Sequence, residues 1–325
     1  MRGKEILLAI VMGVVLPAIL FSVAEKVLPI NHTPPTQQTT EADQSQKPTD
    51  PIIHTDTMIP VLQSDGTTNT LKLEDYLVGV ILGEMPLNFD IEALKAQAVV
   101  ARTYTLRRVL VSQKHDGGAV CVNSACCQSY CPPEQYAGSK ASLNKAIAAV
   151  ASTTGQVITY NGSLIEATYF SCSGGRTEDA QAVWGADIPY LQSVDSPGEE
   201  NATYYTESVR FASREFANLL GIPLSGDPAT WFGAVTYTAG GGVDTMRIGG
   251  VLFKGTQLRH ILGIRSTAFT ITPLGDSVHI VTKGFGHRVG MSQYGAEAMA
   301  VAGSDCRQIL SHYYPGTELV NRNQN

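Results

Sequence analysis

The feature that most constrains this chain is a run of nineteen largely apolar residues near its N-terminus, residues 6–24. A helix of that length is about 28 Å long, close to the hydrocarbon thickness of a bilayer. Arg2 and Lys4 precede the run, and basic residues on that side favour a cytoplasmic N-terminus. The sequence therefore predicts a cytoplasmic stub at residues 1–5, a single-pass transmembrane anchor at 6–24, and an extracytoplasmic remainder.

A cleaved signal peptide is the alternative interpretation of this run, because Ser22, Val23 and Ala24 offer a peptidase a possible cleavage site. The apolar region of such peptides is usually about 7–15 residues long. The longer run here favours the anchor, and both interpretations place the rest of the chain outside the cytoplasm.

Residues 25–57 are rich in Thr, Gln, Pro and Asp and poor in apolar side chains. Such a stretch cannot bury enough surface to offset its ordering entropy, so we predict a flexible linker. Residues 58–325 then form the catalytic domain, long enough for one large domain or two interleaved lobes. The net charge of −6 argues against a protein that reads nucleic acid, and we predict no nucleic-acid partner.

Strand-like and helix-like segments alternate along the predicted domain, separated by Gly-rich turns. Helices are predicted over 73–83, 90–113 with Asp90 as cap, 142–153 and 292–302. Strands are predicted over 58–63, 68–72, 156–160, 164–170, 235–237, 245–248, 269–273 and 278–282. We therefore predict an α+β fold, in which helices and antiparallel strands form a curved catalytic domain with a substrate cleft.

The first chemical candidate is Glu84, which follows Gly83 and lies among Leu82, Met85 and Leu87. Burial among apolar side chains would raise the pKa of this carboxyl group. A proton held near neutral pH is what a general acid needs to protonate a glycosidic oxygen. An exposed turn glutamate is the alternative.

The helix predicted after Asp90 carries an unusual number of cations for an acidic protein. Lys95 and Arg102 are seven residues apart and share one face of that helix. For Arg107, Arg108 and Lys114 we favour a solvated face near the C-terminus of the helix, where positive charge is stabilising.

Six motifs, in order along the chain, resemble the stage II sporulation protein D family. They are LEDYL at 73–77, GEMP at 83–86, EALKAQA at 92–98 continued by ARTY at 101–104, FSCSGGRT at 170–177, GHRVGMSQYGA at 286–296, and HYYPG at 312–316. The resemblance spans about residues 58–320, essentially the whole predicted domain, and it also accounts for the anchor.

Members of this family are membrane-anchored lytic transglycosylases, so the resemblance implies the same activity here. It implies cleavage of denuded peptidoglycan between N-acetylmuramic acid and N-acetylglucosamine, with a 1,6-anhydro product, during engulfment in endospore formation. Glu84 would protonate the leaving oxygen and then accept the proton of the sugar's 6-hydroxyl. Because that hydroxyl replaces water as nucleophile, the second carboxylate of ordinary glycosidases is not needed.

The resemblance also implies a set of substrate-binding residues. Lys95 and Arg102 would bind the lactyl carboxylate that each muramic acid exposes once its stem peptide is removed. Alternatively, either cation pairs with Glu84 or with another acid and serves stability. The other residues expected to line the cleft are Ser171, Ser173, His287, Ser292, Gln293 and Tyr294. Arg288 stands where the family usually has a small residue, most often glycine.

Four cysteines and a histidine follow the basic helix with the spacing H-x5-C-x4-C-C-x3-C. Disulfides are the usual state of extracytoplasmic cysteines, but adjacent Cys126 and Cys127 cannot easily bridge each other. Thiolates and imidazole at these spacings suit Zn²⁺. Clostridial members are similar, which implies His115, Cys121 and Cys127 as ligands. Cys126 stands where a histidine would be expected, and Cys131 is an alternative fourth ligand.

Four protein ligands would make the zinc structural, because no coordination position remains for an activated water. We predict no organic cofactor. As in the family, the expected partners are glycan strands, a sporulation amidase that strips stem peptides, and a polytopic membrane protein of the engulfment complex. The expected location is the engulfing membrane of the mother cell.

Two other function classes compete with the transglycosylase. A noncatalytic modifier of wall amidases is one, because relatives with that role share this domain. A zinc hydrolase is the other, although the sequence has no H-E-x-x-H helix.

Overall fold

The computed structural model describes residues 56–322 of the chain, all of which belong to one compact unit. The predicted stub and anchor, and all but the last two residues of the predicted linker, lie outside the described residues. Within 56–322, no helix combines the length and the apolar character needed to cross a membrane.

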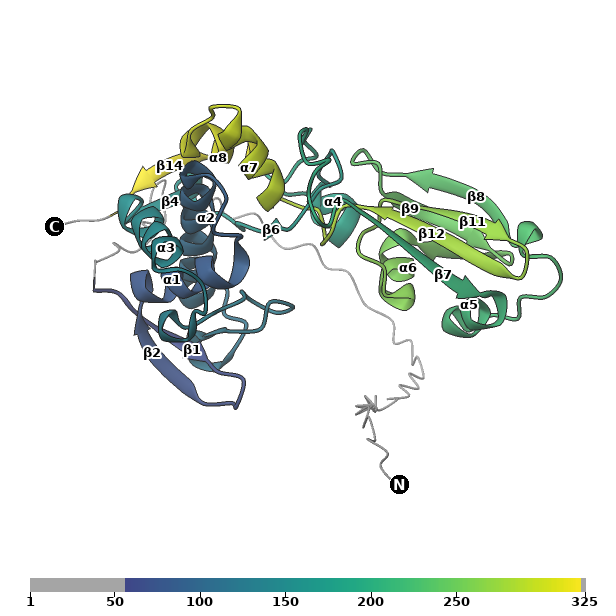
Figure 1. The fold of residues 1–325 in the computed structure, drawn as a ribbon, viewed down its shortest axis with the longest axis horizontal. Helices are drawn as coiled ribbons and strands as arrows, with labels where there is room; N and C mark the ends of the chain where they lie inside the picture. The colour runs from purple at the N-terminus through teal and green to yellow at the C-terminus, as the bar shows by residue number, and fades with distance from the viewer. Residues whose placement is uncertain (1–55, 323–325) are drawn as a thin grey trace, which may run out of the picture. The chain divides into compact units, whose positions relative to one another are not determined.

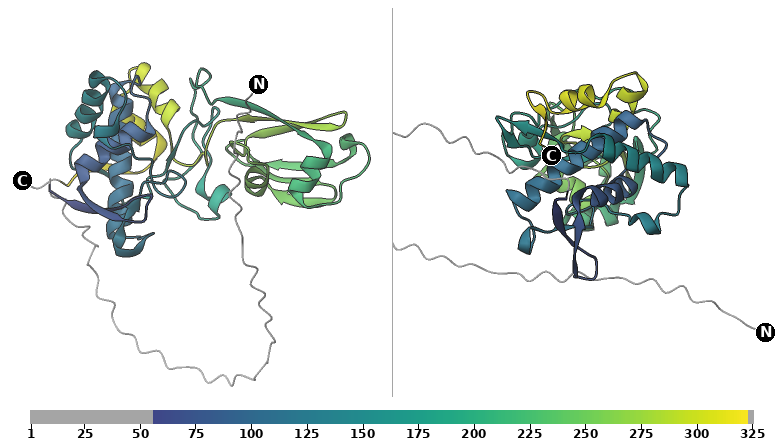
Figure 2. Two further views of the ribbon diagram at one scale, coloured as in Figure 1. Left: turned by 60° about the horizontal axis from the view of Figure 1, so that its bottom comes forward. Right: turned by 90° about the vertical axis from the view of Figure 1, so that its left-hand side faces the viewer.

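The first of two hydrophobic cores surrounds helix α2 (Ile91–Leu110). Small side chains such as Ala93, Ala96 and Ala101 are fully buried, which lets neighbouring helices approach closely. Figures 1 and 2 show α2 in the middle of a group of helices. The helices that contact it are α1 (Leu73–Glu84), α3 (Lys140–Ser152), α7 (Gln293–Val301) and α8 (Cys306–Tyr313).

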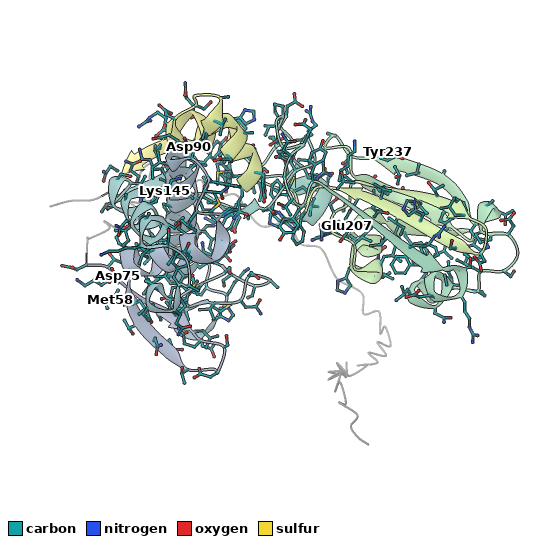
Figure 3. The ribbon with its side chains drawn as sticks, in the orientation of Figure 1. Met58, Asp75, Asp90, Lys145, Glu207 and Tyr237 are labelled. Carbon is teal, nitrogen blue, oxygen red and sulfur yellow. The ribbon has the colours of Figure 1, made fainter. Side chains whose placement is uncertain are left out.

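Asp90 begins α2 as predicted, since its carboxylate accepts a hydrogen bond from the Glu92 N–H at 2.8 Å. Its own N–H donates to Glu297 of α7 at 2.5 Å. Lys145 of α3, labelled with Asp90 in Figure 3, donates to the carbonyl oxygen of Phe89. The start of α2 is therefore tied to two neighbouring helices.

Two small sheets flank this helical core. In the first, β1 (Met58–Leu62) pairs antiparallel with β2 (Thr68–Lys72) and parallel with β3 (Val120–Cys121). In the second, β4 (Gln156–Tyr160) pairs antiparallel with β5 (Ser163–Leu164) and with β14 (Glu318–Asn321).

The second hydrophobic core is formed by residues 216–280. In the sequence this range lies between the two segments that form the first core, residues 59–191 and 289–314, and it folds mainly into strands. Phe216 and Trp231 stack in it with ring centroids 6.4 Å apart. One sheet has the order β11 (Phe269–Leu274), β12 (Ser277–Lys283), β7 (Thr206–Ala212). The other has the order β10 (Val251–Lys254), β9 (Val243–Ile248), β8 (Phe232–Tyr237). Helices α5 (Ser213–Leu220) and α6 (Gly255–Leu262) pack against these strands.

The predicted α+β class is confirmed, and each predicted helix is present within a few residues of its expected ends. The single strand predicted over 164–170 is wrong. Its beginning forms β5, whereas its end forms β6 (Tyr169–Phe170), which pairs in parallel with β13 (Met291–Ser292). This pair and the β1–β3 pair are parallel, whereas the other strand pairs are antiparallel as predicted.

Candidate functional site

Glu84 is the last residue of α1, and its carboxylate is partly buried in a set of neutral donors. The Ser129 N–H donates to Oε1 at 2.5 Å, and the Tyr169 hydroxyl donates to the same oxygen at 3.1 Å. The Gln293 amide donates to Oε2 at 3.5 Å. Burial raises the pKa of Glu84, as the sequence indicated, while these hydrogen bonds oppose the rise.

Within residues 56–322, no ion pair or hydrogen bond joins Glu84 to a cation or to a second carboxyl group. The site thus offers one carboxyl group that holds its proton more tightly than usual and has fixed hydrogen-bonding partners. That arrangement suits a general acid.

A chain of hydrogen bonds behind Glu84 orients the Tyr169 hydroxyl. The Gln128 amide donates to the Tyr169 oxygen at 3.3 Å. The Gln128 side-chain oxygen in turn accepts from Tyr76 at 3.2 Å and from Thr105 at 2.8 Å. Because Gln128 fills the acceptor side of the Tyr169 hydroxyl, the hydroxyl proton is directed at Glu84. Burial raises the pKa of Tyr169 well above its ordinary value, so the hydroxyl remains a donor.

Two glycines of α1 explain how Ser129 reaches Glu84. Gly79 and Gly83 are four residues apart and share one face of the helix. A Cβ at Gly83 would lie 2.9 Å from the Ser129 backbone, and one at Gly79 would lie 2.1 Å from the Tyr130 ring. The backbone of this segment can therefore lie directly on α1, although glycine inside a helix costs about 1 kcal/mol relative to alanine.

The predicted metal ligands His115, Cys121, Cys126 and Cys127 converge in the structure. Their ligand atoms all lie within 4.8 Å of one another. Cys126 Sγ is 3.4 Å from His115 Nε2 and 4.0 Å from Cys127 Sγ, and Cys127 Sγ is 3.6 Å from the same nitrogen. Zinc bonds of about 2.3 Å to sulfur and 2.0 Å to nitrogen place tetrahedral neighbours about 3.5–3.8 Å apart. The chemistry and spacing of these four groups therefore fit a zinc ion.

The competing disulfide interpretation does not describe this structure, in which all six cysteines are free. Cys131, the alternative fourth ligand, lies outside the cluster and directs its thiol to the Pro132 carbonyl oxygen at 3.8 Å.

Three predicted substrate-binding residues lie in or near β13 and α7. Gln293 contacts Glu84 directly, as described above. Ser292 is fully buried and caps α7, where its hydroxyl accepts from the Gly295 N–H at 3.1 Å. Tyr294 packs edge-on against Phe89 with ring centroids 5.0 Å apart, and its N–H donates to the Ser171 carbonyl oxygen at 3.0 Å. Of these residues and Ser171, only the Gln293 side chain has a hydrogen bond to Glu84 in the described structure.

Ser173 belongs to a buried polar network rather than to the surroundings of Glu84. Its N–H and hydroxyl donate to Glu199 at 2.7 and 2.9 Å, and its carbonyl oxygen accepts from Arg288 at 2.6 Å. Arg288 has a φ of +65°, a conformation that favours glycine, and its buried guanidinium pairs with Glu178 at 3.1 Å. The departure from glycine at this position therefore supplies a buried cation.

His287 lies beside the ring of Phe170, with centroids 5.7 Å apart, and the ring of Trp184, at 5.3 Å. Burial lowers the pKa of His287 to about 4, so its imidazole is neutral at pH 7. The neutral His287 ring therefore packs at steep angles against two aromatic side chains, and its role as a contact residue rather than a catalyst stays a prediction.

The two cations predicted to bind substrate occupy different environments. Lys95 is partly exposed and pairs with Glu92 at 2.6 Å. Arg102 is fully buried, and its guanidinium forms a two-pronged ion pair with Glu74 at 2.9 and 2.6 Å. It also donates to the backbone carbonyl oxygen of Gln156 at 3.2 Å. This burial corrects the substrate-binding prediction for Arg102 and supports the stability alternative.

Sequence reasoning missed Tyr169, Gln128 and Ser129, all of which support Glu84. Tyr169 directly precedes the motif that begins at Phe170, and the other two directly follow Cys127. Their positions at the edges of recognised motifs are the only sequence signal that points to them.

Comparison with known proteins agrees with the motifs. A family model described as stage II sporulation protein matches residues 63–160. The chain is 36% identical over 327 residues to stage II sporulation protein D of Bacillus subtilis (strain 168), covering 96% of this chain and 95% of that protein. The protein of the same name from Bacillus amyloliquefaciens is 37% identical over 307 residues, covering 91% and 88%. The amidase enhancer of Bacillus subtilis is 30% identical, covering 75% of this chain and 40% of that protein. The similarity to two proteins of one name over nearly their whole length shows that the chain belongs to the stage II sporulation protein D family.

Proposed function

We propose that this protein is a lytic transglycosylase that cleaves peptide-free peptidoglycan strands between N-acetylmuramic acid and N-acetylglucosamine during engulfment. The observation that carries the proposal is the environment of Glu84, a partly buried carboxyl group with a raised pKa and fixed neutral donors. Membership of a sporulation family supports the wall as the place of action.

The reaction needs one group that first gives and then takes a proton. Protonated Glu84 donates to the glycosidic oxygen as the bond to the muramic acid C1 breaks. The resulting carboxylate then removes the proton of the 6-hydroxyl of the same sugar as that oxygen bonds to C1. Hydrogen bonds from Ser129, Tyr169 and Gln293 stabilise the carboxylate between the two steps.

Product analysis tests the proposal. The purified chain is incubated with glycan strands from which an amidase has removed the stem peptides, and the products are analysed by mass spectrometry. We expect chain ends in the 1,6-anhydro form, which weigh one water less than hydrolysed ends. Hydrolysed ends, or intact strands, would contradict the proposal.

A noncatalytic modifier of wall amidases is the second candidate, because the chain is also similar to an amidase enhancer. This candidate predicts intact strands in the assay above and a faster amidase when the chain is added. The assay therefore separates the two functions.

We also propose that His115, Cys121, Cys126 and Cys127 hold a structural zinc ion, for which their geometry is suitable. Bound zinc would link His115 and Cys121 to Cys126 and Cys127, which directly precede Gln128 and Ser129. With four protein ligands it would leave no position for substrate.

We expect the purified chain to contain about one zinc ion, and Cys121→Ser to contain much less, because structural sites need all four ligands. Elemental analysis measures both. Hydrogen exchange gives a second readout, since chelation should increase exchange in residues 115–131. A content below about 0.2 zinc per chain would contradict the site.

The anchor at residues 6–24 would place this activity at the outer face of the membrane, close to the wall. We propose, as in the family, that the chain works there with a sporulation amidase and a polytopic membrane protein. The amidase would supply the peptide-free strands. Lys95 remains our candidate for binding the lactyl carboxylate.

Glu84→Gln is expected to raise the unfolding temperature at neutral pH. Burial raises the pKa of Glu84 above its ordinary value of 4.5, so the folded chain holds this proton more tightly than the unfolded chain. The stability from this effect is complete below the unfolded pKa and is lost as pH rises through the folded pKa. Thermal unfolding at stepped pH should show the variant's advantage growing as pH rises. An advantage that is constant with pH would contradict this assignment.

A further inference from the structure

A cavity of about 570 Å³ lies beside α4 (Ala180–Trp184), apart from the groups that contact Glu84. The rest of its lining includes residues just after β8, in β9 and β10, and at the start of α6. This volume falls in the range of small-molecule sites.

Glu178 is one of the residues that line the cavity, and one of its two carboxylate oxygens lacks a hydrogen-bond donor. Glu178 is fully buried, and its Oε1 accepts from Arg288 at 3.1 Å, from Thr238 at 2.8 Å and from the Gly242 N–H at 3.0 Å. Its Oε2 is also buried but has no hydrogen-bond partner in the structure. Because an unpaired buried acceptor is costly, the cavity favours a ligand that brings an N–H or O–H donor.

An exposed aromatic ring forms another part of the wall. Trp184 is 44% exposed, and its ring is supported by the ring of His287 at 5.3 Å. Thr256 and Gln181 add a hydroxyl and an amide to the lining. An indole face beside hydrogen-bonding groups suits a ligand with one apolar face and several polar substituents.

The charges of the lining narrow the class of ligand further. Besides Glu178, the carboxylates of Asp179 and Asp244 line the cavity, which disfavours an anion despite the presence of Lys254. A metal ion is also disfavoured, because among the described residues only the group around His115 brings three potential ligand atoms close enough to share an ion. A neutral ligand that is rich in donors fits best.

The cavity is connected to Glu84 through three residues in contact. The Trp184 ring contacts His287, His287 has a backbone hydrogen bond with Tyr169, and the Tyr169 hydroxyl donates to Glu84. The lining of the cavity and Glu84 are therefore linked through only two intervening residues, His287 and Tyr169.

We propose that this cavity binds an N-acetylated amino sugar of the glycan strand, separate from the sugars that flank the cleaved bond. The acetamido N–H is the donor for Glu178 Oε2, and the acetyl methyl group and an apolar sugar face pack on Trp184. The identity of the polymer rests on the proposed function. The unpaired oxygen of Glu178 and the exposed ring of Trp184 are features of the structure and do not depend on that function.

Tryptophan fluorescence gives a direct test, because the chain has only two tryptophans. Trp231 is 7% exposed and belongs to the second core, so an added ligand should change the emission of Trp184. The full chain carrying Glu84→Gln is titrated with β-1,4-linked N-acetylglucosamine oligosaccharides and, in parallel, with β-1,4-linked glucose oligosaccharides of the same length, which lack the acetamido groups and carry no added charge. We expect a saturable emission change with the first, and at least about tenfold weaker binding of the glucose oligosaccharides.

Two variants and one control locate the binding in the cavity. Trp184→Ala removes the ring, and Ala239→Phe fills the cavity from an exposed lining position. Each should weaken strand binding about tenfold, measured by calorimetry in the Glu84→Gln background. Tyr237→Ala is the matched control, because Tyr237 is a 57% exposed aromatic residue next to the cavity but not in its lining. Figure 3 labels its position at the end of β8.

Unchanged binding by Trp184→Ala and Ala239→Phe would overturn the site, and equal binding of the glucose oligosaccharides would overturn the choice of ligand. These measurements use a chain that cannot cleave, so they do not depend on catalysis. A wild-type chain that makes no anhydro ends would overturn the proposed function alone.

Discussion

Glu84→Gln is expected to fold and to lose cleavage of peptide-free strands by about 10²–10⁴-fold, the usual contribution of a general acid–base group. The amide has the shape of the carboxyl group, and its oxygen can still accept from the Ser129 N–H. It cannot, however, give a proton to the glycosidic oxygen or take one from the 6-hydroxyl. The rate of formation of anhydro ends, measured with equal amounts of folded chain, tests this expectation.

Tyr169→Phe is the matched control for position 84. It removes the hydroxyl that donates to Glu84 but leaves the carboxyl group and the packing of the ring. We expect a smaller loss of rate together with a shift of the basic limb of the pH profile to higher pH, because this hydrogen bond lowers the pKa of Glu84 and the reaction starts from protonated Glu84. If Glu84→Gln kept more than about a tenth of wild-type cleavage, Glu84 would not be the general acid.

Arg102→Met is expected to destabilise the chain by about 3–5 kcal/mol, because it leaves Glu74 without its buried partner. The Arg102 side chain is fully buried and joins α2 to α1 through Glu74 and to β4 through the backbone of Gln156. Chemical denaturation followed by circular dichroism measures the loss. Replacing both Arg102 and Glu74 with Met should recover part of it, because no unpaired charge then remains.

Arg176→Met is the control for this prediction. Arg176 also forms an ion pair, with Asp195 at 2.5 Å, but both side chains are largely exposed. Removing an exposed pair should cost less than about 1 kcal/mol. Equal losses for the two arginines would show that Arg102 does not act through buried charge.

Local patterns in the sequence predicted those features that depend on neighbouring residues. Asp90 precedes an apolar-periodic segment and caps the helix that follows, because capping involves groups two residues apart. The convergence of His115, Cys121, Cys126 and Cys127 was also predictable, because all four lie within a stretch of thirteen residues, 115–127. Glu84 was found because apolar residues flank it on both sides.

Contacts across long stretches of chain were not predictable in this way. The periodicity of α2 places Lys95 and Arg102 on one face. It does not predict that Glu74 and the end of α3 bury Arg102 while Lys95 stays partly exposed. Likewise, Tyr169 reaches Glu84 across 85 residues. The parallel pairing of β6 with β13 positions Tyr169, and a two-residue strand carries too little pattern to predict its partner.

The segment that carries Cys127, Gln128 and Ser129 has no spare length. The Cys127 thiol belongs to the cluster around His115, the Gln128 amide donates a hydrogen bond to Tyr169, and the Ser129 N–H donates one to Glu84. An insertion or deletion of one residue here would put at least one of these groups out of register. Among homologues that keep both the cluster and the acid, variation in loop length should therefore be confined to other parts of the chain.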